Sequence, residues 1–133
     1  MWKETCTEIL SHKQIICREN RRRIVFVNNR QIQVFKIQVD GCQITEGRKC
    51  DCLVMAETTQ HFVELKGKKI EEAIPQLSRC IELLGLENFR KMAYIVTSRS
   101  PLRSTGIQKM KRNFKKATGA DLKIKNGFII QNI

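Results

Sequence analysis

The sequence predicts an α/β protein in which a mixed β-sheet has helices packed against it. Short β-prone runs separated by turn-forming pairs fill much of the first half of the chain. In the second half, helical stripes of apolar residues alternate with β-prone runs. Hairpins pair strands antiparallel, whereas a helix between two strands makes a parallel crossover, so a sheet with both kinds of pairing is expected.

The N-terminal half is expected to begin with a short helix over Glu4–His12 and to continue as strands. Turn-forming residues follow at Asn28-Asn29, Asp40-Gly41 and Glu57–Gln60, and Gly67 is expected to end the last strand of this half. The runs between these turns predict four strands: Ile24–Val27, Ile32–Val39, Cys50–Ala56 and His61–Lys66.

The C-terminal half is expected to alternate helices and strands. An apolar stripe predicts a helix that ends at Gly85, and Pro75 within it implies that the helix starts nearby or kinks there. A strand over Met92–Thr97 precedes a second helix that ends at Gly119, and Leu122–Ile130 predicts a final strand pair turned at Asn126-Gly127. The stripes consist of Ile70, Ala73, Ile74, Leu77, Ile81 and Leu84, then Ile107, Met110, Phe114 and Ala117. No linker or repeat divides the chain, so a single domain over residues 1–133 is expected.

The charge of the chain favours a polyanionic partner. Lys and Arg number 25 against 13 Asp and Glu, which gives a net charge of +12. Basic residues concentrate in the two flanks, and acids gather between Glu46 and Glu87. Nucleic acid is the expected partner because phosphate contacts supply most nonspecific affinity. An anionic membrane surface and a charge that only keeps the protein soluble are the alternatives.

Six cysteines raise the question of compartment. The first residues, Met1-Trp2-Lys3-Glu4, have no apolar signal-peptide core, and no run of residues reaches the ~20 apolar residues of a membrane span. A cytoplasmic location with reduced thiols is therefore expected, and the cysteines are interpreted mainly as small buried residues rather than zinc ligands.

The residues that suggest chemistry are Asp51, Glu64 and Lys66. Glu64 and Lys66 lie two apart on one predicted strand, so their side chains leave the same face. Asp51 belongs to the preceding hairpin strand and can reach the same end of the sheet. Two converging carboxylates are suited to Mg²⁺, and a nearby ammonium can position a water or stabilise charge in phosphodiester cleavage. An ordinary cross-strand ion pair is the alternative.

This pattern resembles the PD-(D/E)xK nuclease superfamily. The resemblance rests on Asp51-x12-Glu64-x-Lys66 on a hairpin, within Lys49–Val54 and Phe62–Gly67, and on the helical segment Ala73–Leu77. It implies a restriction-endonuclease-like core, αβββαβ, over about residues 4 to 98. It also implies that Asp51 and Glu64 bind Mg²⁺, which Mn²⁺ can replace, and that Lys66 assists the attacking water.

Two further features of the superfamily point to accessory residues. Many members place an extra acid on the first helix, where Glu4 and Glu8 are available, and Glu8 is taken as the accessory candidate. Some members carry a glutamine on the helix after the motif, which Gln76 matches, although Cys80 stands where those members have tyrosine.

A Mg²⁺-dependent endonuclease acting on DNA is therefore the primary functional hypothesis. A non-catalytic nucleic-acid-binding module of the same fold and an RNA-directed nuclease are the alternatives. Homodimerisation is expected to help so short a chain hold a duplex. The expected nucleic-acid contacts come from an arginine run and from the outer face of the last helix: Arg21, Arg22, Arg23, Lys109, Arg112, Lys115 and Lys116.

Overall fold

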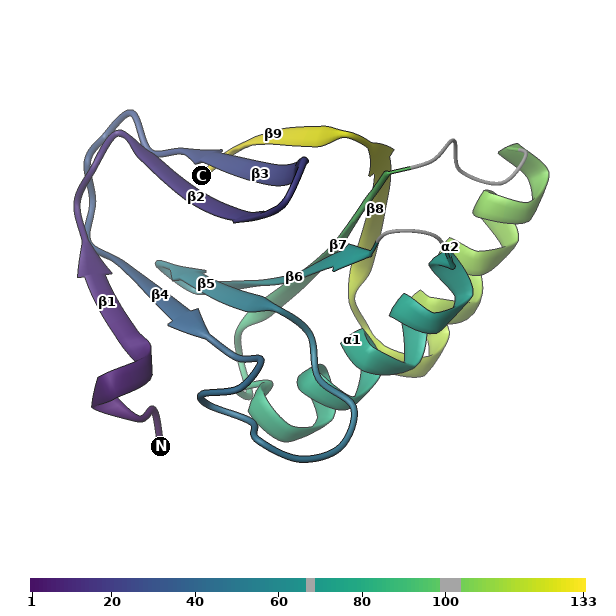
Figure 1. Ribbon diagram of the computed structural model, residues 1–133, viewed down its shortest axis with the longest axis horizontal. Helices are drawn as coiled ribbons and strands as arrows, with labels where there is room; N and C mark the ends of the chain where they lie inside the picture. Colours follow the sequence, from purple (N-terminus) through teal and green to yellow (C-terminus); the bar gives the residue numbers. More distant parts are fainter. Residues whose placement is uncertain (67–68, 99–103) are drawn as a thin grey trace.

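The computed structural model describes residues 1–66, 69–98 and 104–133, which form three layers (Figure 1). A six-stranded mixed sheet is the middle layer. Two helices cover one of its faces, and a three-stranded sheet covers the other. The expected α/β class, with a mixed sheet and helices packed against it, is confirmed.

The six-stranded sheet has the order β1-β4-β5-β6-β7-β8. Its strands are β1 (Thr7–Leu10), β4 (Val34–Gln38), β5 (Cys52–Ala56), β6 (Thr59–Lys66), β7 (Arg90–Thr97) and β8 (Asp121–Asn126). The three-stranded sheet contains β2 (Gln14–Glu19), β3 (Arg22–Val27) and β9 (Phe128–Asn132). The helices are α1 (Ile70–Leu84) and α2 (Ser104–Thr118), and a short 3₁₀ turn, η1, spans Glu4–Cys6.

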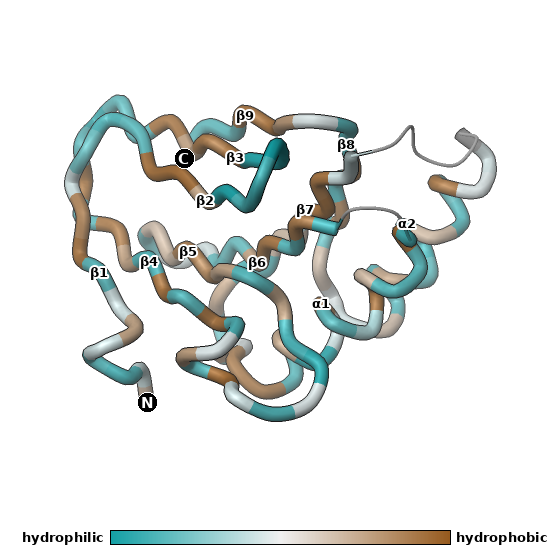
Figure 2. Tube along the Cα trace, viewed as in Figure 1, coloured by the Kyte–Doolittle hydropathy of each residue, from teal (hydrophilic) through white to brown (hydrophobic). Residues whose placement is uncertain are grey.

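The pairing changes from antiparallel to parallel at β6. Strands β4, β5 and β6 pair antiparallel, and β6, β7 and β8 pair parallel through the crossovers made by α1 and α2. Both faces of the middle sheet are covered, so β5 is buried along its whole length and forms the continuous apolar run seen in Figure 2. The turn between β5 and β6 needs only Glu57 and Thr58, with Glu57 in the left-handed region at φ 52°.

The two helices follow the expected apolar stripes, with local differences. Helix α1 begins at Ile70 and continues through Pro75. Gly85 follows α1, as expected, in extended backbone at φ −65°, and a Cβ there would collide with the carbonyl oxygen of Ile81. In α2, Phe114 is buried and Ala117 is exposed, so the stripe is shorter than expected. Gly67 lies outside the described residues.

The expected helix over Glu4–His12 is wrong. Only η1 is helical there, and the chain continues as β1, which pairs antiparallel with β4. Ile9 is exposed, so no inward helical stripe forms. The strand Gln14–Glu19 was not expected from the sequence either. Pairing with a strand distant in sequence overrides the weak local preference of this segment.

The last two strands do not pair with each other. Gly127, at φ +83°, turns the chain between β8 and β9 as the sequence indicates. Strand β8 then pairs with β7 in the large sheet, and β9 pairs parallel with β3 in the small one. The final hairpin expected over Leu122–Ile130 is therefore wrong, because the two strands join different sheets.

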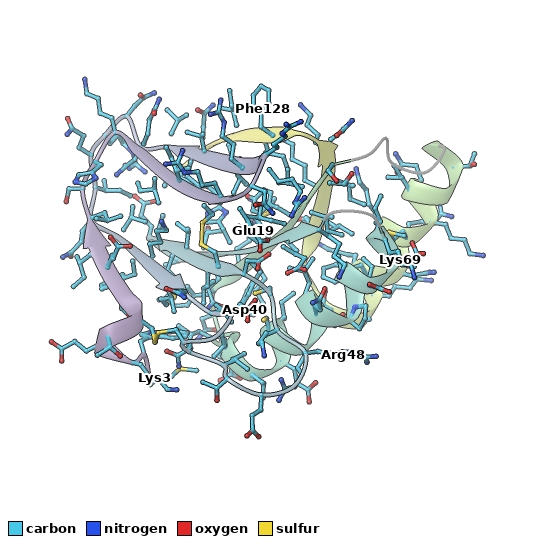
Figure 3. The ribbon with its side chains drawn as sticks, in the orientation of Figure 1. Lys3, Glu19, Asp40, Arg48, Lys69 and Phe128 are labelled. Atoms are coloured by element: carbon cyan, nitrogen blue, oxygen red, sulfur yellow. A yellow bond between two sulfur atoms is a disulfide. The ribbon has the colours of Figure 1, made fainter. Side chains whose placement is uncertain are left out.

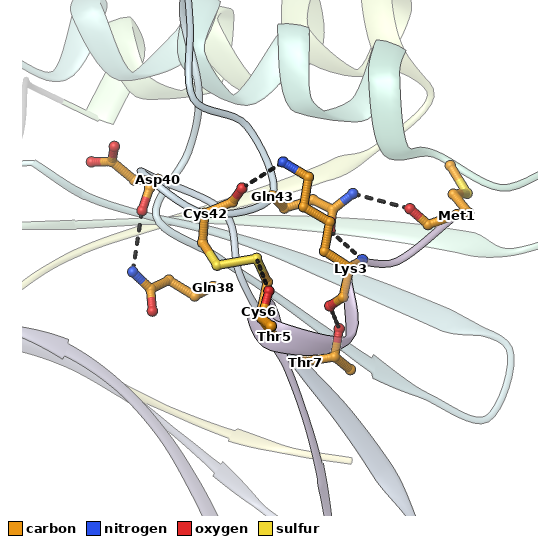
Figure 4. Close-up of a disulfide and its surroundings, with 9 residues drawn as sticks. All are labelled: Met1, Lys3, Thr5, Cys6, Thr7, Gln38, Asp40, Cys42 and Gln43. Carbon is orange, nitrogen blue, oxygen red and sulfur yellow. Dashed lines mark hydrogen bonds between the residues drawn. A yellow bond between two sulfur atoms is a disulfide. The ribbon is translucent and has the colours of Figure 1, made fainter.

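Four of the six cysteines form disulfides, so the expectation of reduced thiols is wrong. Cys6 and Cys42 join the N-terminal segment to the β4–β5 connection (Figure 4). Cys17 and Cys52 join β2 to β5 and so link the two sheets. Cys50 and Cys80 are free and buried, as expected for core thiols. Among the described residues, neither helix is long and apolar enough to cross a membrane.

Candidate active site

The β5–β6 hairpin brings the carboxyl groups of Asp51 and Glu64 together. Cys52 pairs with Val63, so the next residues in the same register, Asp51 and Glu64, lie opposite each other. The backbone N–H of Asp51 donates to the Val63 carbonyl oxygen at 2.9 Å. Asp51 Oδ2 in turn accepts a hydrogen bond from the backbone N–H of Leu65 at 2.7 Å. Backbone pairing and this side-chain contact together hold Asp51 at the start of β5.

Burial makes this carboxyl pair hold a proton. Glu64 is only 4% exposed, and Asp51 is half-buried. Burial, followed by the charge and hydrogen bond of Asp51, raises the pKa of Glu64 to about 9. Burial also raises the pKa of Asp51, although the hydrogen bonds with Leu65 and Glu64 oppose that shift. At neutral pH the pair therefore keeps one proton, which a bound cation would have to displace.

Gln76 of α1 orients Glu64. With its amide nitrogen turned toward the carboxylate, Gln76 donates to Glu64 Oε2 at 2.8 Å and to the Glu72 carbonyl oxygen at 3.0 Å. Glu64 Oε1 is buried and has no hydrogen-bond partner among the described residues. Buried carboxylate oxygens normally have a partner, so this one has an unfilled requirement for a proton or a cation.

The carboxylates of Asp51 and Glu64 suit Mg²⁺ better than they suit a metal ion whose ligands all come from protein side chains. No group of three His, Cys, Asp or Glu residues able to hold a metal occurs within residues 1–66, 69–98 and 104–133. The protein ligands that the described residues offer to a metal ion here are therefore the two carboxylates of Asp51 and Glu64. Mg²⁺ is commonly bound by one or two carboxylates, with water and substrate phosphate as its other ligands.

Lys66 lies beside the carboxyl pair but is bound to another acid. Its Nζ is 3.2 Å from Glu72 Oε2, and Lys69 lies 3.7 Å from the other Glu72 oxygen. Lys66 is close enough to Glu64 for its charge to favour the ionised carboxylate. The hydrogen bond from Lys66 also lowers the pKa of Glu72. Glu72, not predicted from the sequence, thus holds the lysine at the mouth of the site.

These residues line a cavity of about 610 Å³ that the second sheet helps to enclose. Its walls include Asp51, Glu64, Lys66 and Gln76, together with Glu19 at the end of β2. Figure 3 shows Glu19 at the β2–β3 hairpin, and the same cavity is lined by Asp40 of the β4–β5 connection. Glu19 was missed because β2 was missed, and its charge helps to raise the pKa of Asp51.

Glu8 lies in a neighbouring cavity rather than on a helix. It belongs to β1 and lines a space of about 330 Å³ that also reaches Asp51, Arg18 and Lys36. The expectation that a first helix presents an accessory acid is therefore wrong in its structural premise, since that helix does not form. Glu8 still faces a space that Asp51 also lines.

The arginine run divides between two surfaces. Arg22 lines the large cavity, is 13% exposed in its side chain and lies 3.7 Å from Glu19. Its Nε is buried and has no hydrogen-bond partner in the described part of the chain. Arg21 and Arg23 are exposed on the other side of the hairpin. Strand alternation separates neighbours that the sequence presents as one cluster.

The basic face of α2 is exposed but does not line the cavity. Lys109, Arg112, Lys115 and Lys116 are all exposed, and none of them contributes to the walls around Asp51 and Glu64. Lys115 Nζ forms an ion pair with Asp121 Oδ1 at 2.9 Å. This face can therefore offer three basic side chains without a described acidic partner to a polyanion.

The remaining reactive side chains have structural roles. His61 is buried, with Nδ1 2.7 Å from the Tyr94 hydroxyl, and burial lowers its pKa to about 4. The thiol sulfur of Cys80 accepts a hydrogen bond from the backbone N–H of Cys50 at 2.8 Å. These contacts agree with the interpretation of these two cysteines as core residues.

The arrangement can bind a hard divalent cation at Asp51 and Glu64, with cationic side chains around it. An anion bound at the cation would meet Lys66 and Arg22, which line the same cavity. No protein-family model, curated protein or solved structure matches the chain. The chemistry of these side chains therefore carries the functional argument.

Proposed function

We propose that the protein is a Mg²⁺-dependent endonuclease that hydrolyses phosphodiester bonds in DNA, with Asp51, Glu64 and Lys66 as its catalytic centre. The observation that carries the proposal is the buried Asp51–Glu64 pair, in which one Glu64 oxygen has no partner among the described residues and the cavity beside it contains Lys66 and Arg22. A net charge of +12 supports a nucleic-acid substrate. Mn²⁺ is proposed to replace Mg²⁺.

The strand order supports membership of the PD-(D/E)xK superfamily as part of this proposal. Three antiparallel strands, β4 to β6, are followed by α1 and by the parallel strand β7. This is the order that the restriction-endonuclease-like core implies, with Asp51 and Glu64 on its hairpin. The chain departs from that pattern at its start, where η1 and β1 stand in place of the first helix.

Each residue has a distinct role in the proposed reaction. A Mg²⁺ ion held by Asp51 and Glu64 would act as a Lewis acid and would lower the pKa of a water molecule beside the phosphate. Asp51 and Glu64 hold the cation, which requires the shared proton to leave. Gln76 fixes the orientation of Glu64 through its amide nitrogen. Lys66 positions the attacking water and offsets negative charge that develops on the phosphate.

The test is incubation of the protein with linear, supercoiled, branched and single-stranded DNA, and with RNA. Each substrate is offered with Mg²⁺, with Mn²⁺ or with chelator, and the Glu64→Gln variant is the matched control. We expect metal-dependent cleavage of DNA by the wild type and none by the variant. Equal cleavage by both proteins, or cleavage that persists in chelator, would overturn the assignment of the site.

Two observations favour a second candidate, a non-catalytic nucleic-acid-binding module. The Lys66 ammonium is bound by Glu72, and the raised pKa of Glu64 keeps the carboxyl pair partly protonated at neutral pH. Under this alternative the protein binds nucleic acid but cleaves no substrate with either metal. Cleavage of RNA in preference to DNA would instead identify an RNA-directed nuclease.

A cytoplasmic location and a homodimer belong to the same proposal. Disulfides are uncommon in the reducing cytosol of mesophiles but occur inside hyperthermophilic cells. The protein has disulfides at Cys6–Cys42 and Cys17–Cys52. The proposed cytoplasmic location therefore requires a cytosol that is oxidising enough to keep them. Sedimentation equilibrium with and without DNA tests the dimer.

A further inference from the structure

We propose that the outer face of the three-stranded sheet binds unpaired nucleotides at the end formed by Arg18, Arg21, Arg23 and Phe128, with Phe128 as the side chain on which a base stacks. This inference names a substrate class for the proposed function and rests on it in one respect, that nucleic acid is the ligand. Its evidence lies on β2, β3 and β9, outside the carboxylate pair.

Phe128 presents its ring to solvent from a sheet. Ile129, the next residue on β9, is fully buried between the two sheets, so strand alternation directs Phe128 and Ile130 to the opposite face. Phe128 is 49% exposed. Figure 3 shows it above β9, on the side away from the six-stranded sheet. A half-exposed aromatic ring on a regular strand offers a flat surface to a ligand in solvent.

Arginines surround this ring. The parallel register places Arg23 of β3 beside Phe128, with the guanidinium carbon 5.6 Å from the ring centroid. The antiparallel register places Arg18 of β2 beside Arg23. With Arg21 at the end of the hairpin, these residues and Phe128 line a cavity of about 260 Å³. None of the three arginines forms an ion pair within the described residues.

An aromatic ring among unpaired arginines suits a single strand. In a duplex the base faces are stacked on one another, so a ring on a sheet can reach them only at an end or a break. In a single strand the bases are free to stack on aromatic side chains while cations hold the phosphates. The guanidinium of Arg23 adds a second planar surface next to the ring.

A second copy of the chain fits this face less well. Partly exposed apolar side chains do continue along the sheet, in the row Ile16, Val25 and Ile130. A two-fold symmetric contact, however, would place the same patch against itself and so bring its arginines close to those of the partner. Charge complementarity therefore favours an anionic ligand over self-association.

The proposed nucleotide-binding surface around Phe128 continues toward the carboxylate pair of Asp51 and Glu64. Arg18 lines both the cavity beside Phe128 and the cavity that reaches Asp51. A single nucleic-acid strand with one base stacked on Phe128 can therefore contact Arg18 and extend to Asp51. The favoured substrate is therefore a nucleic acid with an unpaired segment next to the cleaved bond.

The test measures binding in chelator, so that no cleavage interferes. The probes are a labelled oligothymidylate of about 15 nucleotides, an abasic oligonucleotide of the same length and a duplex of the same length. The variants are Phe128→Ala, Phe128→Leu, which keeps apolar bulk without a π-face, and Phe128→Trp, which keeps the π-face. Ile130→Ala is the matched control, because Ile130 is exposed on the same strand but does not line the cavity beside Phe128.

We expect Phe128→Ala and Phe128→Leu to weaken oligothymidylate binding by roughly tenfold or more, as removal of one base-stacking surface should. Binding of the abasic strand should change little, Phe128→Trp should bind like the wild type, and Ile130→Ala should change affinity by less than about twofold. An oligoribouridylate assayed beside the DNA probe shows which kind of single strand binds more tightly.

Several results would overturn the inference. These are wild-type affinity in Phe128→Leu, an equal loss of affinity for the abasic and base-bearing strands, or an equal loss of affinity in Ile130→Ala. If the protein binds single strands through Phe128 but cleaves no substrate, the proposed catalysis is wrong and the nucleotide-binding surface is supported. If the protein cleaves DNA but its Phe128 variants bind single strands with wild-type affinity, the nucleotide-binding surface is wrong and the proposed catalysis is supported.

Discussion

Lys66 at the end of β6 and Glu72 in α1 form an ion pair, with 3.2 Å between Nζ and Oε2. The carbonyl oxygen of Glu72 also accepts the Gln76 amide that orients Glu64. The start of α1 therefore holds both the motif lysine and, through Gln76, the motif glutamate. A helix that directly follows a strand places its first turns at that strand's end, which is why these contacts converge.

Lys66→Met should lower cleavage by about 10²–10³-fold, the scale of losing one group that stabilises a transition state. Lys69→Met is the matched control, because Lys69 also pairs with Glu72 but is more exposed. Rates measured in single-turnover assays should fall in the first variant and change little in the second. If the cleavage rate falls equally in both variants, Lys66 acts only as one of several positive charges near the substrate and has no specific role in catalysis.

Glu64→Gln should abolish the stabilisation of the protein by Mg²⁺. A ligand at 100 times its Kd stabilises by about 2.7 kcal/mol, so the wild-type melting temperature should rise by roughly 8 °C, at about 3 °C per kcal/mol for a domain of this size. The amide cannot neutralise the cation, and the melting temperature of the variant should not respond. This readout needs no nuclease activity, and a wild-type protein whose melting temperature ignores Mg²⁺ would contradict the metal site.

Without metal, stability should fall as pH rises from about 5 to 9. The pKa of Glu64 is raised from 4.5 to about 9 in the folded protein, so between these values the unfolded chain releases a proton that the folded one keeps. The contribution is complete below pH 4.5 and is lost as pH rises through the folded pKa, at most about 1.4 kcal/mol per pH unit. Urea unfolding in chelator should show a smaller decline for Glu64→Gln. Parallel declines would place the titration elsewhere.

Mg²⁺ affinity should rise over the same pH range, because the carboxyl pair must lose its proton to bind the cation. Calorimetry in buffers of different ionisation enthalpy should detect proton release on binding near pH 7. Affinity that is independent of pH would show that the pair is already ionised.

Replacement of Lys109, Arg112 and Lys116 by Gln should weaken binding to all duplex sequences alike. Each phosphate that the variant no longer neutralises should flatten the salt dependence by up to about 0.9 log unit. Lys115→Gln should have a smaller effect on this slope, because Lys115 already pairs with Asp121. An unchanged slope in the triple variant would leave this face a solubilising or protein-binding role.

Segments with strong local patterns were predicted well. The β5–β6 hairpin and both helices follow from an apolar run with a short turn and from two stripes of helical period. Gln76 was also identified from the sequence, and Glu72 was recognisable in retrospect, since it lies one helical turn earlier on the same face. Strands β1 and β2 were missed because their stability comes from partners distant in sequence.

By itself, the sequence determined the α/β class, the strong positive charge and the hairpin that holds Asp51 and Glu64, because each depends on composition or on residues close together in the chain. Only the tertiary structure decided that Cys17 joins Cys52, that β9 pairs with β3, and that Arg22 turns into the cavity while Arg23 lies beside Phe128. These are contacts between distant segments, and many pairings bury similar apolar area. The choice among them depends on how all three layers pack at once.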